Sequence, residues 1–480
     1  MNKTSVAGRG VIFLMVSKAY FIIAGYAIHF GLARLLGKEL FGLFGIINTV
    51  VGVLNAVLIT GTIQMVSKFV SQDEKKSGAV LKSALQLQVL VGGGLFALYY
   101  LSAPLIARFF KDQGLIPYFR LSGLIVICYA FYAIYMGYIN GRRKFGLQAC
   151  LDMGYSTLKM TLMLCFVAAG IGVAGAIGGF ALAAFSLLVI AMFVIGRRPG
   201  HGSFSKGALF NFEAFIMIFA LIMYLLLQTD LWLLKRLSPH DISYIRAAYY
   251  YAAQKIAFIP YQAIIAITFV LFPYVSRLSF IDDKIRLKEY IRQALRYSLI
   301  ILVGLAALFS ANSQGMIRIL FPAGYEAGAP ALSLLVFGIV FFSLLYINAT
   351  IISGSGRPAH SFLIALGTWV VDILLNYSFI PRFGMMGAAS STTAAMFLGL
   401  VVSAIYVKRR FGTYLPLASF LRVGAAGGAV AALSLIFPCR GLILIAKLIA
   451  LSLVYLGFLR LIGEIGKEDI SRIKATMKRS

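Results

Sequence analysis

The chain has 480 residues, of which 61% are hydrophobic and only 12% are charged, and its mean hydropathy is +0.91. Because charged residues make up about a quarter of a soluble domain, this composition excludes an ordinary soluble protein and indicates an integral membrane protein. A net charge of +28 would suggest nucleic-acid binding in a soluble protein, but basic cytoplasmic loops account for most of it in a membrane protein.

A helix that spans a bilayer needs about 20 mostly apolar residues, and the chain contains fourteen runs of this kind. We predict an all-α integral membrane fold, with two spans joined by the Gly-rich turn "AAGIGVAGAIGG". The predicted spans are 11–36, 41–66, 80–102, 118–140, 147–169, 173–195, 208–234, 245–274, 290–312, 327–352, 361–380, 386–407, 418–437 and 442–462.

The connecting segments differ in basic residues between the two sides of the membrane. Those on the side of the N-terminus hold 27 Lys and Arg residues, whereas the opposite loops hold about nine. We therefore expect a multi-pass protein of the cytoplasmic membrane with both termini cytoplasmic. The basic fringe should contact anionic lipid headgroups rather than nucleic acid.

The first lysine inside a span is Lys18, in 11–36, and His29 lies about 20° from it around the same helix. In the span 147–169, Lys159 shares a face with Asp152 and Tyr155. Lys159 either forms a structural pair with Asp152 or lines a cavity. Lys18 has no acidic residue within one turn, so a cavity position is favoured, whereas His29 is more often a hydrogen-bond partner between helices.

In the second half of the chain, Lys255 lies in the span 245–274, with Tyr251 and Gln262 on the same helical face. Lysines from both halves would make a central cavity electropositive and suited to an anionic substrate. Arginines and a lysine near predicted span ends are expected to extend towards headgroups. These are Arg34, Arg246, Arg296, Arg422 and Lys447.

Acidic residues inside the spans are fewer. Asp230 lies in "LLLQTDLWLL", and Asp372 lies between Thr368 and Asn376 at intervals of four residues. The next span begins with "GAASSTTAA", which adds hydroxyl groups and small residues that allow close approach of helices. Such oxygen ligands suit a hard cation, and a buried carboxyl can instead carry a proton. A purely structural role for Asp372 is the alternative.

The remaining features argue against catalysis. The cysteines have no metal-ligand or disulfide spacing and are read as core residues. We find no nucleophile–base arrangement, no phosphate-binding loop and no large external loop of the kind that a polysaccharide polymerase or ligase needs. The chain is therefore not expected to be an enzyme, and no cofactor is expected apart from a coupling ion.

Four short motifs recur in the same order at an offset of about 212 residues. "GYINGRRKF" corresponds to "TIISGSGRP", and "VAGAIGG" corresponds to "MMGAASS". These repeats predict two parallel lobes of six helices and a central site between them. The predicted domains are an N-lobe at 1–200, a C-lobe at 201–412, and two additional helices with a tail at 413–480.

The ordered set of motifs resembles the polysaccharide transporters of the multidrug/oligosaccharidyl-lipid/polysaccharide (MOP) exporter superfamily. It comprises "GYINGRRKF", "QTDLWLLKRLSPHDISYIRAAYYYAAQKI", Pro273 in "VLFPYVSRL" and "FIPRFGMMGAASST". The resemblance runs through essentially the whole chain. It implies two six-helix lobes that alternate in access, and a flippase for polyprenyl-pyrophosphate-linked oligosaccharides.

In lipid II flippases of this superfamily, a sodium site uses an Asp, an Asp/Asn pair, a backbone carbonyl and a Thr. The resemblance carries these roles onto Asp230, Asp372, Asn376, Ala388 and Thr392, with the acid and amide of the pair exchanged, which leaves Na⁺ and a proton as alternatives. Lys18 and Lys255, with Lys159, His29, Tyr251 and Gln262, would bind the pyrophosphate head.

The second span lacks the cavity arginine of lipid II flippases, which favours a Wzx-like or sporulation-type flippase over a lipid II flippase. A multidrug/cation antiporter of the same superfamily is the less favoured alternative, because it should have twelve spans and an acidic cavity. The expected partners are a polyprenyl-pyrophosphate glycolipid and membrane lipids, with a monomer as the default state.

Overall fold

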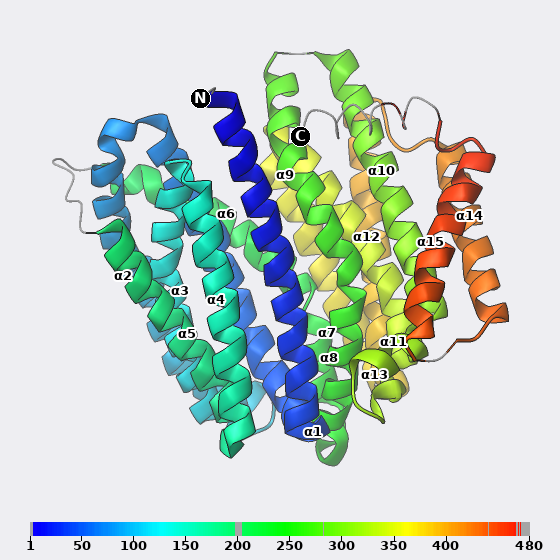
Figure 1. Cartoon of the computed structure of the whole chain (residues 1–480), viewed down its shortest axis with the longest axis horizontal. Coiled ribbons are helices and arrows are strands. Elements are labelled where there is room, and N and C mark those ends of the chain that lie inside the picture. The colour runs from blue at the N-terminus through cyan, green and yellow to red at the C-terminus, as the bar shows by residue number, and fades with distance from the viewer. Residues whose placement is uncertain are drawn as a thin grey trace. The chain divides into compact units, whose positions relative to one another are not determined.

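The computed structural model describes residues 3–196, 204–281, 283–439, 441–466, 469 and 471. These residues form helices and connecting turns, and no strand occurs among them. The α-helices of Figure 1 are α1 Lys3–Gln72, α2 Ser77–Phe109, α3 Ile116–Gly141, α4 Phe145–Phe166, α5 Gly172–Ile195, α6 Lys206–Leu226, α7 Thr229–Leu237, α8 Ser243–Ala257, α9 Ile259–Phe280, α10 Lys284–Ala311, α11 Ser313–Leu320, α12 Ala329–Gly354, α13 Pro358–Phe411, α14 Leu417–Ile436 and α15 Ile443–Leu461. Short helical turns lie between some of them: η1 Glu74–Lys76, η2 Gln113–Leu115, η3 Val167–Ile171, η4 His240–Ile242 and η5 Tyr325–Gly328.

Ten helical segments in the described part of the chain are long and apolar enough to cross a membrane. Three of these segments, Phe13–Gln72, Phe145–Ile195 and Pro358–Phe411, each contain two of the predicted spans. The backbone turns inside α1 at Gly37 (φ 74°) and inside α13 at Gly384 (φ 57°). Glycine accepts positive φ without steric cost, so the predicted boundaries at 36/41 and 380/386 correspond to real breaks. The all-α membrane fold is confirmed.

Two other predicted spans are divided in the structure. The span 208–234 is interrupted between Leu226, the last residue of α6, and Thr229, the first residue of α7. The span 245–274 is divided into α8 and α9 at Phe258, and Pro260 lies in the first turn of α9. Proline lacks an N–H and is tolerated at a helix start, so it favours a new helix at this point.

The chain forms two compact units, Met1–Gln228 (unit 1) and Thr229–Ser480 (unit 2). In unit 1, α1 packs against α3, α4 and α6. In unit 2, α12 packs against α13, α9 and α10, and α13 packs against α7. The boundary between the units lies after Gln228, because α6 packs on α1; the predicted lobes at 1–200 and 201–412 stay a prediction. The predicted separation of 413–480 stays a prediction, since α14 packs against α10 within unit 2.

The two units repeat the same helix contacts. A Cβ on Gly141, at the end of α3, would meet the Ser67 carbonyl oxygen at 2.8 Å, and a Cβ on Gly354, at the end of α12, would meet the Phe272 carbonyl oxygen at 3.3 Å. The second pair of glycines behaves in the same way. A Cβ on Gly175 would meet the Phe166 carbonyl oxygen, and one on Gly387 would meet that of Phe379. The internal repeat read from the sequence is therefore also a repeat of packing.

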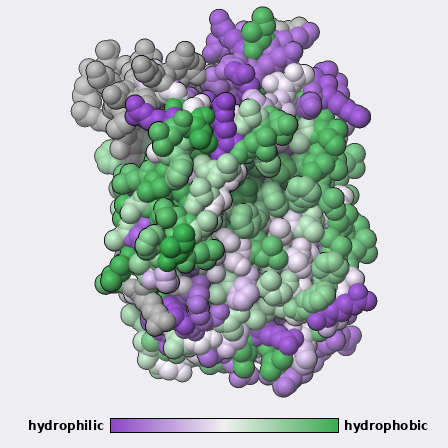
Figure 2. All heavy atoms as spheres, turned by 90° about the vertical axis from the view of Figure 1, so that its right-hand side faces the viewer, coloured by the Kyte–Doolittle hydropathy of each residue, from purple (hydrophilic) through white to green (hydrophobic). Residues whose placement is uncertain are grey.

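The face of the molecule seen in Figure 2 has an apolar band between hydrophilic ends. In unit 2, α14 and α15 pack against each other and on α10 (Figure 1). These two helices carry many exposed large apolar side chains, such as Leu421 at 60% and Leu453 at 66% exposure. A surface of this kind would be an aggregation hazard in water, and lipid chains would cover it in a bilayer.

Candidate functional site

Asp230 is the second residue of α7 and is 1% exposed. Its Oδ2 accepts a hydrogen bond from the Tyr250 hydroxyl at 2.6 Å, and its Oδ1 accepts bonds from the Leu231 N–H at 2.7 Å and from Gln254 Nε2 at 3.2 Å. The break between α6 and α7 places this carboxyl at a helix N-terminus, where the helix dipole favours negative charge. One helix, α8, supplies both the tyrosine and the glutamine.

Asp372 lies in the first half of α13 and is fully buried. Its Oδ1 accepts hydrogen bonds from Asn376 Nδ2 at 2.9 Å and from the Thr392 hydroxyl at 3.0 Å. Thr392 lies in the second half of α13, beyond the turn at Gly384, and also interacts with the carboxyl of Asp230. The break in α13 and the break before α7 therefore bring four of the predicted ion-site residues together: Asp230, Asp372, Asn376 and Thr392.

This cluster has buried acceptor atoms in excess of donors. Asp372 Oδ2 and Asn376 Oδ1 have no hydrogen-bond partner within the described residues. The two carboxyl groups are near enough for their charges to interact unfavourably, and the hydrogen bonds that they accept come from neutral groups. A small cation or a proton would relieve both problems, so the residues present fit either one.

The cluster is suited to a main-group cation rather than a transition metal. No group of three or more His, Cys, Asp or Glu side chains that could hold a metal ion occurs in the described part of the chain. Oxygen ligands from carboxylates, an amide and a hydroxyl instead favour a hard cation.

Two predicted neighbours of the cluster have defined positions. Ala388 is fully buried one turn before Thr392, and the proposed role of its carbonyl oxygen stays a prediction. The Thr368 hydroxyl donates to the Ile364 carbonyl of its own helix at 2.8 Å. Next to it, the Trp369 indole N–H donates to the Thr229 hydroxyl at 2.9 Å. This last bond fixes α13 to the start of α7, directly beside Asp230.

The predicted cationic residues of unit 1 have partners. Lys18 forms an ion pair with Asp152 at 3.1 Å, in which the lysine side chain is 61% exposed and the aspartate side chain 13%. Lys159 places its ammonium group 3.6 Å from the centre of the Phe180 ring. The His29 ring lies 6.4 Å from that of Phe44. Asp152 thus pairs with Lys18 of α1, a helix that packs on α4 but is distant from it in the sequence, and this pair was not predicted.

In unit 2, the Lys255 ammonium group lies 4.4 Å from the centre of the Tyr251 ring, a cation–π contact. Tyr251 is fully buried and Lys255 is partly exposed. Gln262 lies beyond the break at Phe258, on α9. The prediction that it shares one continuous helix with Tyr251 and Lys255 is therefore wrong. Whether Lys255 and the lysines of unit 1 line one cavity stays a prediction.

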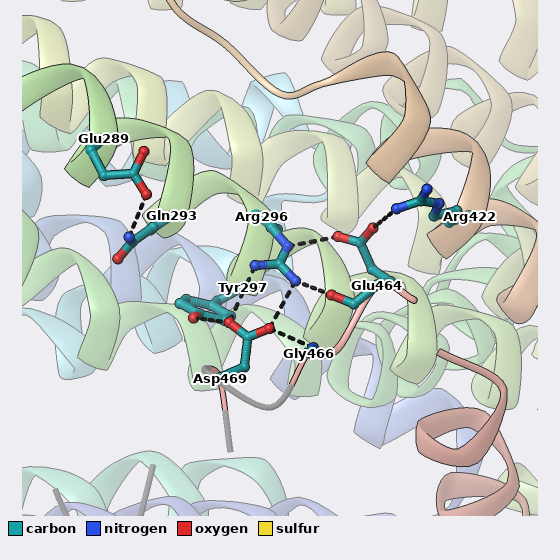
Figure 3. A network of polar contacts seen from close by, with 8 residues as sticks. All are labelled: Glu289, Gln293, Arg296, Tyr297, Arg422, Glu464, Gly466 and Asp469. Atoms are coloured by element: carbon teal, nitrogen blue, oxygen red, sulfur yellow. Dashed lines mark hydrogen bonds and ion pairs between the residues drawn. The ribbon is translucent and has the colours of Figure 1, made fainter. Parts of the chain in front are cut away.

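A second polar cluster lies at the end of unit 2 (Figure 3). Arg296 of α10 forms ion pairs with Glu464 at 2.7 Å and with Asp469 at 3.1 Å, and the Tyr297 hydroxyl donates to Asp469 at 2.5 Å. Arg422 of α14 lies on the other side of Glu464, at 3.7 Å. A cavity of about 420 Å³ adjoins these side chains. The prediction that Arg296 extends towards headgroups is wrong, because its guanidinium is bound by two carboxylates.

Lys447 also differs from the prediction. Its ammonium group donates to Asn312 Oδ1 at 2.9 Å and to the Ser434 carbonyl oxygen at 2.7 Å. It therefore joins α15 to α14 and to the segment after α10 instead of extending to headgroups.

One buried acid inside an apolar run was not predicted from the sequence. Glu213 of α6 is fully buried, and its carboxyl accepts a hydrogen bond from the Thr62 hydroxyl at 2.6 Å. It lies in "LFNFEAFIMIF", so an acidic residue inside an apolar run, the signal that identified Asp372, would have found it.

Comparison with known proteins identifies the family. Residues 31–330 match the polysaccharide biosynthesis protein family. The uncharacterized membrane protein MJ1068 of Methanocaldococcus jannaschii is 36% identical over 27% of this chain and 25% of its own length. The uncharacterized membrane protein YabM of Bacillus subtilis is 24% identical over 69% of this chain and 66% of its own length. The chain thus spans about a quarter of the length of MJ1068 and about two thirds of the length of YabM.

Solved structures share the fold at low sequence identity. A lipid II flippase MurJ in an inward closed conformation has a TM-score of 0.78 at 15% identity and covers 94% of this chain and 98% of its own. An outward-facing MATE family multidrug resistance transporter of the MOP superfamily has a TM-score of 0.65 at 14% identity and covers 86% and 96%. The chain therefore belongs to the polysaccharide biosynthesis protein family and has the fold of MOP-superfamily transporters.

Proposed function

We propose that this protein is a flippase that moves a polyprenyl-pyrophosphate-linked oligosaccharide across the cytoplasmic membrane by cation-coupled alternating access. The observation that carries the proposal is the combination of membership in a polysaccharide biosynthesis family with the fold of a lipid II flippase over 94% of the chain. A polysaccharide pathway that assembles its units on a lipid inside the cell needs a protein that transfers the hydrophilic head to the other side.

The acidic cluster of unit 2 supports the coupling part of the proposal. Asp230 and Asp372 come from separate helices, α7 and α13, and are joined through Thr392. A bound Na⁺ or proton would neutralise the two carboxyl groups and allow the helices to pack closely. Asp372 Oδ2 and Asn376 Oδ1 would accept it, because these oxygens have no partner in the described structure.

Cation binding can drive transport only if the cluster binds the ion more strongly in one conformation than in another. The helix breaks beside Asp230 and at Gly384 support this part of the proposal, because a small rotation of α7 or of either half of α13 would separate the oxygens of the cluster. Loss of the ion would then leave two carboxylates in a low-dielectric site and favour the separated arrangement.

The lysines support an anionic substrate. An exposed ion pair such as Lys18–Asp152 contributes about 0–1 kcal/mol, so a pyrophosphate carrying two or more charges can displace the aspartate. Lys255 and Lys159 rest on aromatic rings, contacts that hold an ammonium group in place without neutralising it. We propose that Lys18, Lys255 and Lys159 bind the pyrophosphate, and that His29, Tyr251 and Gln262 line the same substrate-binding cavity.

Head-group translocation in proteoliposomes tests the substrate assignment. A short fluorescent polyprenyl-pyrophosphate oligosaccharide is incorporated, and a membrane-impermeant quencher reports how much label reaches the other leaflet. Wild type should accelerate translocation and Lys18→Ala/Lys255→Ala should lose it. Lys82→Ala/Lys288→Ala, which removes two exposed basic residues from other positions, should behave as wild type.

The outcomes distinguish the alternatives. Transport of lipid II in preference to the oligosaccharide lipid would assign the narrower function of the structural relative. Export of a cationic dye without lipid translocation would contradict the flippase proposal and indicate an antiporter.

A further inference from the structure

Another buried acid lies within unit 1 and belongs to neither of the clusters described above. Glu213 of α6, Thr62 of α1 and Gln88 of α2 are each fully buried. The Thr62 hydroxyl donates to Glu213 Oε1 at 2.6 Å and accepts a hydrogen bond from Gln88 Nε2 at 3.4 Å. Three helices therefore meet at one buried polar triad.

Two oxygens of this triad are not satisfied. Glu213 Oε2 and Gln88 Oε1 have no hydrogen-bond partner within the described residues. Both atoms are acceptors if the carboxyl is ionised, and burying unsatisfied acceptors is costly. A proton on Oε2 turns that oxygen into a donor, while the amide oxygen of Gln88 remains an acceptor. The triad then has one donor and one acceptor in place of two acceptors without partners. Protonation therefore removes the excess of acceptors.

Among the residues that the structure describes, no charged side chain forms an ion pair with Glu213. The helices that pack against α6 are α1 and α2. On α1, the Lys68 ammonium group lies 3.9 Å from the centre of the Phe212 ring, and on α2, Lys82 is exposed. On α6 itself, Lys206 is exposed and Tyr224 is the other titratable side chain. An ionised carboxylate without a close cation is strongly disfavoured in an apolar interior.

The packing of α6 on α1 closes the triad. Gly61 precedes Thr62, and a Cβ at this position would lie 2.5 Å from Met217 Cγ and 3.4 Å from Glu213 Cγ. The absence of a side chain there lets α6 lie directly on α1 and closes the triad. A small separation of these two helices would open it to water.

We propose that Glu213 is a proton-binding site of unit 1 that binds a proton in the closed packing of α1 against α6 and releases it when the two helices separate. It is distinct from the Asp230–Asp372 cluster, which lies in unit 2. Proton binding does not depend on the identity of the transported lipid; only its use in the transport cycle rests on the proposed function.

Infrared difference spectroscopy of the full-length protein in lipid vesicles tests the proposal. The carbonyl stretch of protonated carboxylic acids is followed while the pH is changed from about 5 to about 8, the range in which a physiological switch titrates. We expect one band that disappears as the pH rises and that is missing in Glu213→Gln. Glu39→Gln, which changes an exposed acid of α1, should retain the band.

A second variant reports whether the band comes from the triad. Thr62→Val removes the hydrogen bond to Oε1, so the band should change in frequency but remain. Repeating the titration with NaCl in place of choline chloride separates a proton site from a sodium site, because Na⁺ would compete with the proton and remove the band.

Three results would overturn the proposal: a spectrum of Glu213→Gln identical to that of wild type, a Glu213 band that does not change with pH, and a band that Na⁺ removes. The second would make Glu213 a permanently neutral structural residue. If the translocation assay fails while the band titrates as expected, the proposed function falls and the proton site stands.

Discussion

Replacement of Arg296 by methionine should destabilise unit 2 measurably. The guanidinium of Arg296 binds the carboxyl of Glu464 at 2.7 Å and that of Asp469 at 3.1 Å, and it also donates to the Glu464 main-chain oxygen. Glu464 is only 2% exposed. Arg296→Met would leave both carboxylates without this partner while keeping most of the volume of the side chain.

The magnitude follows from burial. Removing one partner of a fully buried ion pair costs about 3–5 kcal/mol. Since the Arg296 side chain is 21% exposed and that of Asp469 is 11% exposed, water weakens the effect and we expect about 2–3 kcal/mol. For a unit of about 250 residues, this corresponds to a decrease in Tm of roughly 4–12 °C.

Tryptophan fluorescence provides the assay, because both tryptophans, Trp232 and Trp369, lie in unit 2. The matched control is Arg292→Met, since Arg292 pairs with Glu289 at 2.8 Å on the same helix while both side chains are about half exposed, at 50% and 46%. Such a pair contributes about 0–1 kcal/mol, so the control should change Tm by less than about 4 °C. Equal decreases in Tm for Arg296→Met and Arg292→Met would refute the reasoning. The double variant Arg296→Met/Glu464→Gln should recover part of the Tm lost in Arg296→Met, because it removes one of the unpaired carboxylates.

Three further predictions concern pH, packing and ion binding. Burial would raise the pKa of Asp469, but hydrogen bonds from Arg296, Tyr297 and the Gly466 N–H lower it from 3.8 to about 2. The stabilising contribution of Asp469 should therefore be complete above about pH 4 and be lost as the pH falls to about 2. The difference in Tm between wild type and Asp469→Asn should be constant near neutral pH and should decrease towards zero between about pH 4 and pH 2. Gly141→Ala places a Cβ 2.8 Å from the Ser67 carbonyl oxygen and should destabilise by about 1–3 kcal/mol, whereas Gly93→Ala, with nothing within 4 Å in α2, should not destabilise; thermal unfolding followed by circular dichroism checks both. Ligand binding at 100 times Kd stabilises by about 2.7 kcal/mol, so if the cluster of unit 2 binds Na⁺, NaCl should raise the wild-type Tm above that in choline chloride and Asp372→Asn should remove the difference.

The positions of the helices followed from local signals. Gly37 and Gly384 separate apolar runs of full membrane length, and both adopt positive φ in the structure. The grouping of Asp372, Asn376 and Thr392 was also accessible, because the first two lie one turn apart and the third follows the Gly384 turn. The recurring motifs align Gly141 with Gly354, and in the structure both glycines lie close to a carbonyl oxygen of a neighbouring helix.

Contacts between distant helices were not accessible from one sequence. Lys18 and Asp152 are separated by 134 residues, and Arg296 and Asp469 by 173. No local period relates such pairs, so Lys18, which has no acidic residue within one turn, was expected to line a cavity, and Arg296 was expected to extend towards headgroups. The interruption at Phe258 was not predicted, because residues 245–274 have the length of a single span, and Pro260 was the local signal of a break.

The most direct test of the account is translocation of a fluorescent polyprenyl-pyrophosphate oligosaccharide by wild type and Asp230→Asn/Asp372→Asn in proteoliposomes, with and without a Na⁺ or proton gradient. We predict that wild type flips the lipid, that one of the two gradients accelerates it, and that the double variant is insensitive to that gradient. Wild-type protein that exports a cationic dye but does not flip the lipid, or a double variant that responds to the gradient like wild type, would contradict the account.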